Sequence, residues 1–209
     1  MQKALFLDRD GIIIQDAGYL RDASLVQLIP TAAELIKRAR EKDYAVVVVT
    51  NQSGIGRSWI SLENYQDVSA RMIDLLAEKG AKLDRIYFAP FYVGANQSPY
   101  PESEFIFETK GVPQEGAWSD LDRKPNPGML IKASRAMEID LAGSVMVGDR
   151  VTDLAAAHNA GLGHFYFRRT EVFEDETRDL DIWKQRLARF KSHEFTSTVV
   201  DLLTEVPLP

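Results

Sequence analysis

The chain has no cysteine among its 209 residues, which excludes disulfide bonds and cysteine-ligated metal centres. Positive charge is scarce, because 25 Lys and Arg face 31 Asp and Glu, and no basic tract stands out. The net charge of -6 argues against non-specific binding to nucleic acid or to an anionic membrane. The N-terminal apolar run is too short for a signal peptide or a membrane span. We therefore expect a cytoplasmic protein.

Short apolar runs alternate with amphipathic stretches along most of the chain. Ser61 is a predicted helix N-cap, Asn126 and Pro127 a predicted cap and first-turn proline, and Gly161 a predicted helix end. This alternation predicts an α/β fold with three α/β/α layers, in which a parallel sheet carries helices on both faces. Strands are expected at residues 4–7, 45–49, 85–89, 145–147 and 164–167, and helices at 31–42, 61–79, 126–137 and 152–160.

Two segments depart from this alternation. Residues 90–122 are polar and aromatic, and we expect a long loop there, which in a compact domain is usually functional or mobile. Residues 171–209 are charged, with predicted helical stretches at 180–190 and 198–203. We interpret residues 1–170 as one domain and residues 171–209 as a helical tail packed on it.

Polar side chains follow several of the predicted strands. Asp8 and Asp10 follow the first strand, Thr50 the second and Asp149 the fourth, while Lys124 stands just before a predicted helix. Because ligands bind beyond the carboxyl ends of parallel strands, we expect these side chains to meet. Oxygen ligands without His or Cys suit Mg²⁺, and the cation and hydroxyl suit a phosphoryl group.

This set of residues suits phosphoryl transfer to a carboxylate. One aspartate of the Asp8/Asp10 pair can attack phosphorus, while the other protonates the leaving oxygen and later activates water. Each motif also has a plain alternative as a turn or a helix cap, and Asp153 in particular suits the N-terminus of the helix that follows it.

The strings DRDG, VVVTNQSG, RKPNPGM and MVGDRVTD resemble the four motifs of the haloacid dehalogenase (HAD) superfamily phosphatases, over about residues 3–168. The nearest resemblance is to the heptose-bisphosphate phosphatases, with histidinol-phosphate phosphatases as relatives, and it implies a Rossmann-like fold with a small loop cap. The resemblance implies Asp8 as nucleophile, Asp10 as general acid/base, and Thr50 and Lys124 as stabilisers of the phosphoryl group. It implies Mg²⁺ held by Asp8, the Asp10 carbonyl and Asp149. It implies a substrate side made of Asp16, Gly18, Tyr19, Asn51, Gln52, Ser53, Arg123 and Arg150.

The chain departs from this family at the loop before RKP, where relatives often bind a structural zinc through Cys and His. The matching positions are Ala89, Phe91, Asp120 and Asp122, so we expect no zinc. We expect apolar packing to anchor the loop instead, through its aromatic residues Phe91, Tyr92, Tyr100, Phe105, Phe107 and Trp118. A further departure, Ile12 where Thr is usual, is expected to leave the chemistry intact.

The leading hypothesis is a monomeric, Mg²⁺-dependent phosphatase of a small phosphorylated sugar such as a heptose bisphosphate, with no nucleic acid or membrane partner. Histidinol phosphate or another small metabolite is an alternative substrate. A non-catalytic binding domain of the same fold, or a phosphotransferase with the same first half-reaction, are the alternatives of other classes.

Overall fold

One parallel sheet forms the centre of the protein. The computed structural model describes residues 1–92, 100–116, 119, 121–170 and 196–209. Within them, eight strands form a sheet in the order β4-β5-β3-β2-β1-β6-β7-β8, and each pair is parallel except β4 with β5. The strands are β1 (Ala4–Leu7), β2 (Ala45–Asn51), β3 (Arg85–Ala89), β4 (Ile106–Thr109), β5 (Val112–Gly116), β6 (Val145–Gly148), β7 (His164–Arg168) and β8 (Thr196–Val200).

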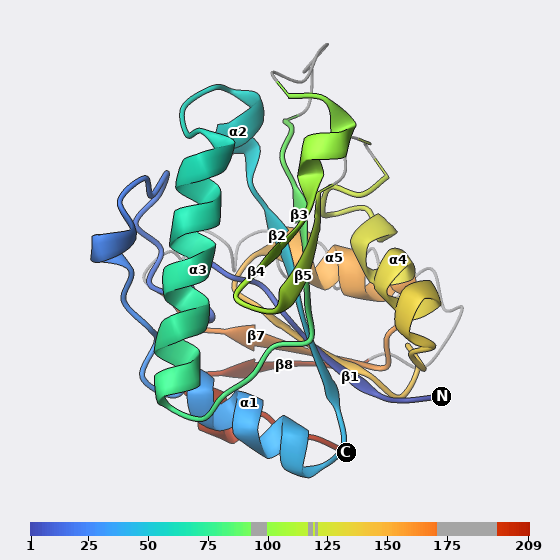
Figure 1. The fold of residues 1–209 in the computed structure, drawn as a ribbon. Helices are drawn as coiled ribbons and strands as arrows, with labels where there is room; N and C mark the ends of the chain where they lie inside the picture. The colour runs from blue at the N-terminus through green and yellow to red at the C-terminus, as the bar shows by residue number, and fades with distance from the viewer. Residues whose placement is uncertain (93–99, 117–118, 120, 171–195) are drawn as a thin grey trace.

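Helices cover both faces of this sheet, as the alternation of elements predicts (Figure 1). On one face, α1 and α3 pack in a core that includes Leu35, Met72 and Val48. On the other face, α4 and α5 pack in a second core that includes Leu130, Leu154 and Val47. The α/β fold class is thereby confirmed. The helices are α1 (Ala32–Glu41), α2 (Ser53–Gly56), α3 (Leu62–Glu78), α4 (Gly128–Met137) and α5 (Val151–Ala160), with 3-10 turns at η1 (Ala23–Leu25), η2 (Glu102–Phe105) and η3 (Leu203–Glu205).

The central strands explain where the site lies. The strand order reverses at β1, since β2 and β3 continue on one side of it and β6 and β7 on the other. An open parallel sheet binds ligands at this switch point, beyond the carboxyl ends of its strands. The ends of β1, β2 and β6 carry Asp8, Thr50 and Asp149, so three of the predicted residues converge there.

None of the helices in the described ranges is long and apolar enough to cross a membrane.

Most predicted helix ends agree with the structure. Ser61 caps α3, because its hydroxyl accepts a hydrogen bond from the Asn64 N–H (3.0 Å) while Asn64 accepts one from the Ser61 N–H. Gly161 ends α5 in the left-handed conformation. The start of α4 differs, because Pro127 and not Asn126 takes the cap position. A shift of one residue is within the ordinary uncertainty of helix ends.

The prediction of one long loop at residues 90–122 is wrong in its second half. Residues 106–116 form an antiparallel hairpin whose second strand, β5, extends the sheet beside β3. Lys110 and Gly111 connect the two strands, both with positive φ (53° and 75°), as a two-residue type I′ turn requires. A Lys-Gly pair between short β-forming runs was the missed signal. The predicted loop cap lies partly on residues 93–99, 117–118 and 120, outside the described residues.

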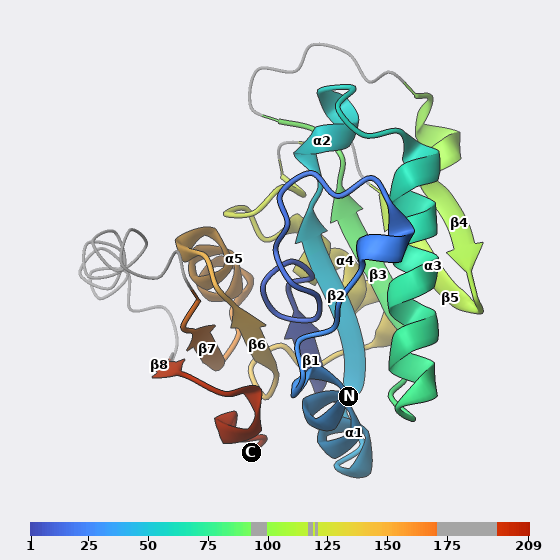
Figure 2. The same ribbon diagram turned by 90° about the vertical axis from the view of Figure 1, so that its left-hand side faces the viewer.

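The expectation of helix at residues 198–203 is also wrong. Residues 196–200 instead form β8, which pairs in parallel with β7, and β7 is therefore not the last strand. The alternating burial of Thr196–Val200 fits an edge strand whose one side faces the core. The remaining residues lie beside α1 (Figure 2), and Leu203, Val206 and Leu208 are buried in the same core as α1. The predicted helix at 180–190 lies outside the described residues.

Candidate active site

Three buried carboxylates and one lysine meet at the ends of β1 and β6. Oxygen atoms of Asp8, Asp149 and Asp153 lie within 4.8 Å of one another. The ammonium of Lys124 lies 2.9 Å from Asp8 Oδ1 and 2.5 Å from Asp153 Oδ1, and donates a hydrogen bond to the Val49 carbonyl (2.8 Å). We call Asp8, Lys124, Asp149 and Asp153 the carboxylate cluster. Each of its members is less than a tenth exposed.

The charges of the carboxylate cluster do not balance. Burial raises the pKa of Asp149 to about 8, and the nearby Asp8 and Asp153 add to this rise. Burial alone would lower the pKa of Lys124, but Asp153 and Asp8 outweigh it and raise that pKa. Lys124 therefore stays charged, but its single positive charge leaves the three carboxylates with an excess of negative charge.

The donor set of the cluster fits a hard divalent cation. Oδ1 of Asp149 is buried and accepts no hydrogen bond from any described residue. A buried carboxylate oxygen without a partner is costly unless a cation approaches it. All candidate ligand atoms are oxygens, which suits Mg²⁺. Asp8 and Asp149 were expected as ligands, and the geometry adds Asp153.

Asp10 points its carboxylate into a separate buried network. Arg9 donates to both of its oxygens, from Nε (3.1 Å) and Nη2 (2.9 Å). The amide of Gln52 donates to Asp10 Oδ2 (2.8 Å) and lies 2.9 Å from Thr50 Oγ1. Burial raises the pKa of Asp10, and the Arg9 guanidinium opposes that rise. The network joins the residues predicted for proton transfer and for phosphoryl stabilisation.

Asn51 and Ser53 complete the segment after β2. Asn51 holds the main chain of Lys124, because its Nδ2 donates to the Lys124 carbonyl (3.0 Å) and its Oδ1 accepts from the Lys124 N–H (3.1 Å). The Asn51 amide therefore binds the main chain of Lys124, and it positions this lysine from β2. Ser53 is half-buried and begins the short helix α2.

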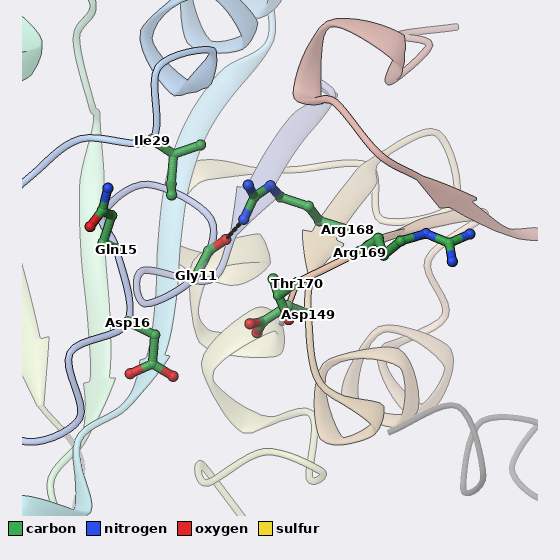
Figure 3. Close-up of a pocket in the computed structure, with 8 residues that line it drawn as sticks. All are labelled: Gly11, Gln15, Asp16, Ile29, Asp149, Arg168, Arg169 and Thr170. Atoms are coloured by element: carbon green, nitrogen blue, oxygen red, sulfur yellow. Dashed lines mark hydrogen bonds between the residues drawn. The ribbon is translucent and has the colours of Figure 1, made fainter. Parts of the chain in front are cut away.

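A cavity of about 630 Å³ lies beside Asp149, between the loop after β1 and the end of β7 (Figure 3). Asp16 lies at its edge, where its carboxylate pairs with Arg150 (3.0 Å) and accepts from the Gly18 N–H (2.9 Å). On the opposite wall Arg168 donates to the Gly11 carbonyl (2.6 Å), the dashed contact of Figure 3. Asp16, predicted for the substrate side, thus lines this cavity beside Asp149, and it contacts Gly18 and Arg150, which were predicted for the same side.

Aromatic rings and arginines form a second group of contacts, beyond the end of β2. The rings of Tyr19 and Trp59 meet edge to face at 4.6 Å, and both are nearly half exposed. The Arg57 guanidinium lies 4.9 Å from the Trp59 ring centroid and 4.0 Å from that of Tyr92. Burial lowers the pKa of Arg123, and the positive charge of Arg57 lowers it further. We call Tyr19, Arg57, Trp59, Tyr92 and Arg123 the aromatic rim.

The hairpin that follows the expected zinc loop is held by apolar packing. Phe105 is fully buried in a cluster with Phe88 and Tyr65, against which Tyr100 and Phe107 pack. Ala89 and Phe91, at two of the expected zinc-ligand positions, are buried apolar residues on the other face of the sheet. Asp122 instead pairs with Lys132 (3.2 Å). Asp120 and Trp118 lie outside the described residues.

Sequence reasoning missed four residues of this site. Asp153 was assigned no role in the site, and a helix cap was its plain alternative. It does accept from the Arg150 N–H (3.0 Å), but its other oxygen meets Lys124. Its place in the first turn of the helix that follows β6 and Asp149 was the available signal, because that turn lies at the carboxyl end of the strand. No local pattern marks Arg9, Arg57 or Trp59, each of which also contacts a residue of a distant segment.

Comparisons with known proteins show which family this chain resembles. The model of the HAD-hydrolase-like family matches residues 121–187. A D-glycero-D-manno-heptose-1,7-bisphosphate 7-phosphatase of Thermosynechococcus vestitus is 37% identical over 159 residues, covering 76% of this chain and 74% of that protein. A D-glycero-beta-D-manno-heptose-1,7-bisphosphate 7-phosphatase of Haemophilus ducreyi is 38% identical over 162 residues, 77% of this chain and 80% of its own.

Solved structures extend the likeness to the whole fold. The D,D-heptose 1,7-bisphosphate phosphatase of B. bronchiseptica, crystallised with magnesium and phosphate, has a TM-score of 0.72 and is 25% identical, over 97% of this chain and 94% of that one. A HAD-like phosphatase of Mesorhizobium loti has a TM-score of 0.66 at 32% identity, over 89% of this chain and 87% of that one.

Proposed function

Because the chain belongs to the HAD-like phosphatase family that includes the heptose-bisphosphate 7-phosphatases, we propose that it hydrolyses a phosphate monoester of a heptose bisphosphate or a closely similar sugar. Its class, a hydrolase of phosphate esters, follows from family membership. The observation that carries the proposal is the position of Asp8, at the end of β1, 2.9 Å from the buried Lys124 ammonium and close to Asp149 and Asp153. A carboxylate held among these charges suits attack on phosphorus.

In the first half-reaction, a carboxylate oxygen of Asp8 attacks phosphorus and the phosphorus–oxygen ester bond breaks. Asp10 gives its proton to the departing sugar oxygen, which leaves as an alcohol. Lys124 and the Thr50 hydroxyl face the phosphoryl oxygens and offset their charge. The product is a phosphoryl group bound to Asp8 and an Asp10 carboxylate.

In the second half-reaction, the Asp10 carboxylate takes a proton from water, and the water oxygen attacks phosphorus. The bond between phosphorus and the Asp8 oxygen breaks, which releases inorganic phosphate and restores both aspartates to their starting forms. The network of Arg9, Gln52 and Asp10 supports this role, because it holds the Asp10 carboxylate in one orientation.

Asp8, Asp149 and the main chain of Asp10 would hold Mg²⁺, with Asp153 beside them. When bound, the ion neutralises the phosphoryl oxygens and the carboxylates around them. The buried Asp149 Oδ1 supports this assignment, because it accepts no hydrogen bond from a described residue and has only a long contact to Arg150 Nε (3.9 Å). We propose no zinc in this protein, because Ala89 and Phe91 are packed in the core and offer no ligand atoms.

The aromatic rim supports a substrate with a second anionic group. Arg57 and Arg123 lie near each other, and neither pairs with a carboxylate of any described residue. Two neighbouring cations that no described carboxylate pairs with favour a ligand that brings its own negative charge. The polar sugar would then lie between the rim and the carboxylate cluster, beside Tyr19.

Phosphate release from a panel of substrates tests the proposal. The panel contains a heptose 1,7-bisphosphate, sugar monophosphates and histidinol phosphate, each with and without Mg²⁺. We expect fastest release from the bisphosphate, a requirement for Mg²⁺, and a loss of about 10⁴-fold or more in kcat for Asp8→Asn. Wild-type turnover by Asp8→Asn would refute the mechanism. Release from histidinol phosphate alone would identify that compound, and not a sugar phosphate, as the substrate. No release from any member of the panel would favour a non-catalytic binding domain.

A further inference from the structure

Arg9 is a buried charge that the proposed chemistry does not use directly. Its side chain is 3% exposed, although it follows the nucleophile in the sequence. A charge at that depth is costly unless its hydrogen-bonding groups are satisfied. Its guanidinium donates to Asp10 through Nε and Nη2 (3.1 and 2.9 Å), and the same Nη2 donates to Gln52 Oε1 (3.0 Å).

These contacts form a closed ring around Asp10. Gln52, which accepts a hydrogen bond from Arg9, donates one through its Nε2 to Asp10 Oδ2 (2.8 Å). The same nitrogen lies 2.9 Å from Thr50 Oγ1. On its other side the Arg9 guanidinium lies 5.7 Å from the centroid of the Tyr65 ring, whose hydroxyl donates to Gln114 on β5 (3.1 Å). Arg9 is therefore fixed from α3 and aimed at both oxygens of one carboxylate.

The geometry points to Arg9 as the positioning residue for Asp10: its two parallel N–H donors fix the plane of the carboxylate that exchanges protons with the leaving oxygen and with water. This inference rests on the proposed function and adds a residue to it. Arg9 itself does not touch the substrate. A guanidinium can hold a carboxylate in this two-point manner, whereas a lysine ammonium offers only a point charge. Orientation errors of about 1 Å at a catalytic group can cost about 100-fold in rate.

Leaving-group dependence distinguishes positioning of Asp10 from general support of the fold. An alkyl phosphate such as a sugar phosphate needs a proton on its leaving oxygen, whereas p-nitrophenyl phosphate releases a stable phenolate without one. The variants Arg9→Met and Arg9→Lys are compared with wild type in single-turnover release of the alcohol or phenolate, so that only the first half-reaction is measured. The ratio of the two rates does not depend on the fraction of folded enzyme.

We expect Arg9→Met to slow release from the sugar phosphate by about 10- to 100-fold, and to slow release from p-nitrophenyl phosphate by much less. Arg9→Lys should restore part of the ratio, because it keeps the charge but loses the second contact. In the Asp10→Asn background, Arg9→Met should leave the ratio unchanged, since the group that it positions is already inactive. Arg71→Met, on the outer side of α3 where Arg71 pairs with Glu78 (3.5 Å), is the matched control and should keep the wild-type ratio.

An equal loss on both substrates in Arg9→Met would overturn the positioning role and leave Arg9 a structural residue. An Arg9→Met effect that persists undiminished in the Asp10→Asn background would also overturn it. The proposed function fails differently, because in that case wild type releases neither alcohol nor phenolate. In the same assay, wild type therefore tests the proposed function and the Arg9 variants test the positioning role.

Discussion

The carboxylate cluster and the aromatic rim lie at the same sheet edge but are built in opposite ways. The cluster is buried and charged, and Lys124 fixes it through contacts shorter than 3 Å to Asp8, Asp153 and Val49. The rim is partly exposed and held by ring contacts, such as Tyr19 on Trp59. Buried ion pairs fix geometry at high cost if broken, whereas exposed ring contacts are individually weak. The first construction suits a reaction common to many phosphate esters, and the second suits a choice among them.

The largest expected effect comes from removing the cation of the carboxylate cluster. Lys124→Met leaves three carboxylates together in a buried site, so we expect a loss of about 3–5 kcal/mol in the free energy of unfolding, measured with urea in the presence of EDTA. Lys110→Met is the control, because Lys110 forms an exposed pair with Asp74 (3.2 Å) and should lose less than about 1 kcal/mol. Equal losses in the two variants would mean that the cluster is not held by its charges.

Alanine variants of two glycines with nearly the same φ distinguish displacement of a site residue from backbone strain. Gly11 (φ 77°) and Gly111 (φ 75°) both lie in the left-handed region, but a Cβ at Gly11 would stand 2.2 Å from Asp149 Oδ2, while one at Gly111 meets no atom within 4 Å. Each alanine variant should lose about 1–2 kcal/mol of stability. Only Gly11→Ala should also lower kcat/KM, by about 100-fold, because it displaces Asp149. A comparable fall in kcat/KM for Gly111→Ala would contradict this separation.

Metal removal and pH test the excess negative charge of the cluster. The pKa of Asp149 is raised to about 8 by burial and by Asp8, against about 3.9 in the unfolded chain. Between these values the folded state binds more protons than the unfolded state, so the metal-free protein should lose stability as pH rises toward 8. Mg²⁺ binds the ionised form, so its stabilising effect should grow over the same range.

Thermal unfolding at pH 6, 7 and 8, with EDTA or with Mg²⁺, measures this effect. Each kcal/mol should appear as about 2–4 °C in Tm for a chain of this size. A Tm difference between the two conditions that stays constant with pH would show that Asp149 does not titrate in the folded protein.

The smallest expected effect belongs to the aromatic rim. Trp59→Ala removes the ring that contacts both Tyr19 and Arg57. We expect KM for a sugar bisphosphate to rise by up to about 10-fold, with kcat nearly unchanged, since cation–π contacts of this kind contribute about 0.5–2 kcal/mol. Leu25→Ala, at a side chain 62% exposed and outside the rim, should leave both constants at wild-type values. A fall in kcat with unchanged KM would place Trp59 in the reaction and not in substrate choice.

The sequence predicts the interior of the sheet better than its margins. Residues 45–49 could be predicted as a strand because a continuous β-branched run is typical of a strand that is buried on both faces of a sheet. The motif residues of the carboxylate cluster could be expected to converge because they follow central parallel strands. The strands β4, β5 and β8 were missed, since margin strands are short and partly polar, and their pairing depends on distant partners: Thr196–Val200 is a strand because β7 lies beside it.

The site follows the same rule. Asp8, Thr50, Lys124 and Asp149 are marked by local motifs, whereas the role of Arg9 depends on Gln52 and Tyr65, which lie 43 and 56 positions away in sequence. Asn51 shows the opposite case, a motif residue whose side chain is used to hold Lys124. Residue type alone does not distinguish a group that faces substrate from one that positions its neighbour.

The packing of residues 203–208 has a consequence for synthesis. Leu203, Val206 and Leu208 fill the same core as Leu5 and Leu35, and Arg38 donates to the carbonyls of Thr204 (2.8 Å) and Val206 (2.7 Å). The first strand likewise finds its β6 partner some 140 residues later. A nascent chain therefore cannot close this core until residues 203–208 have left the ribosome. The strand β1 must wait for partners that are synthesised some 200 positions later before its side of the sheet is fully covered.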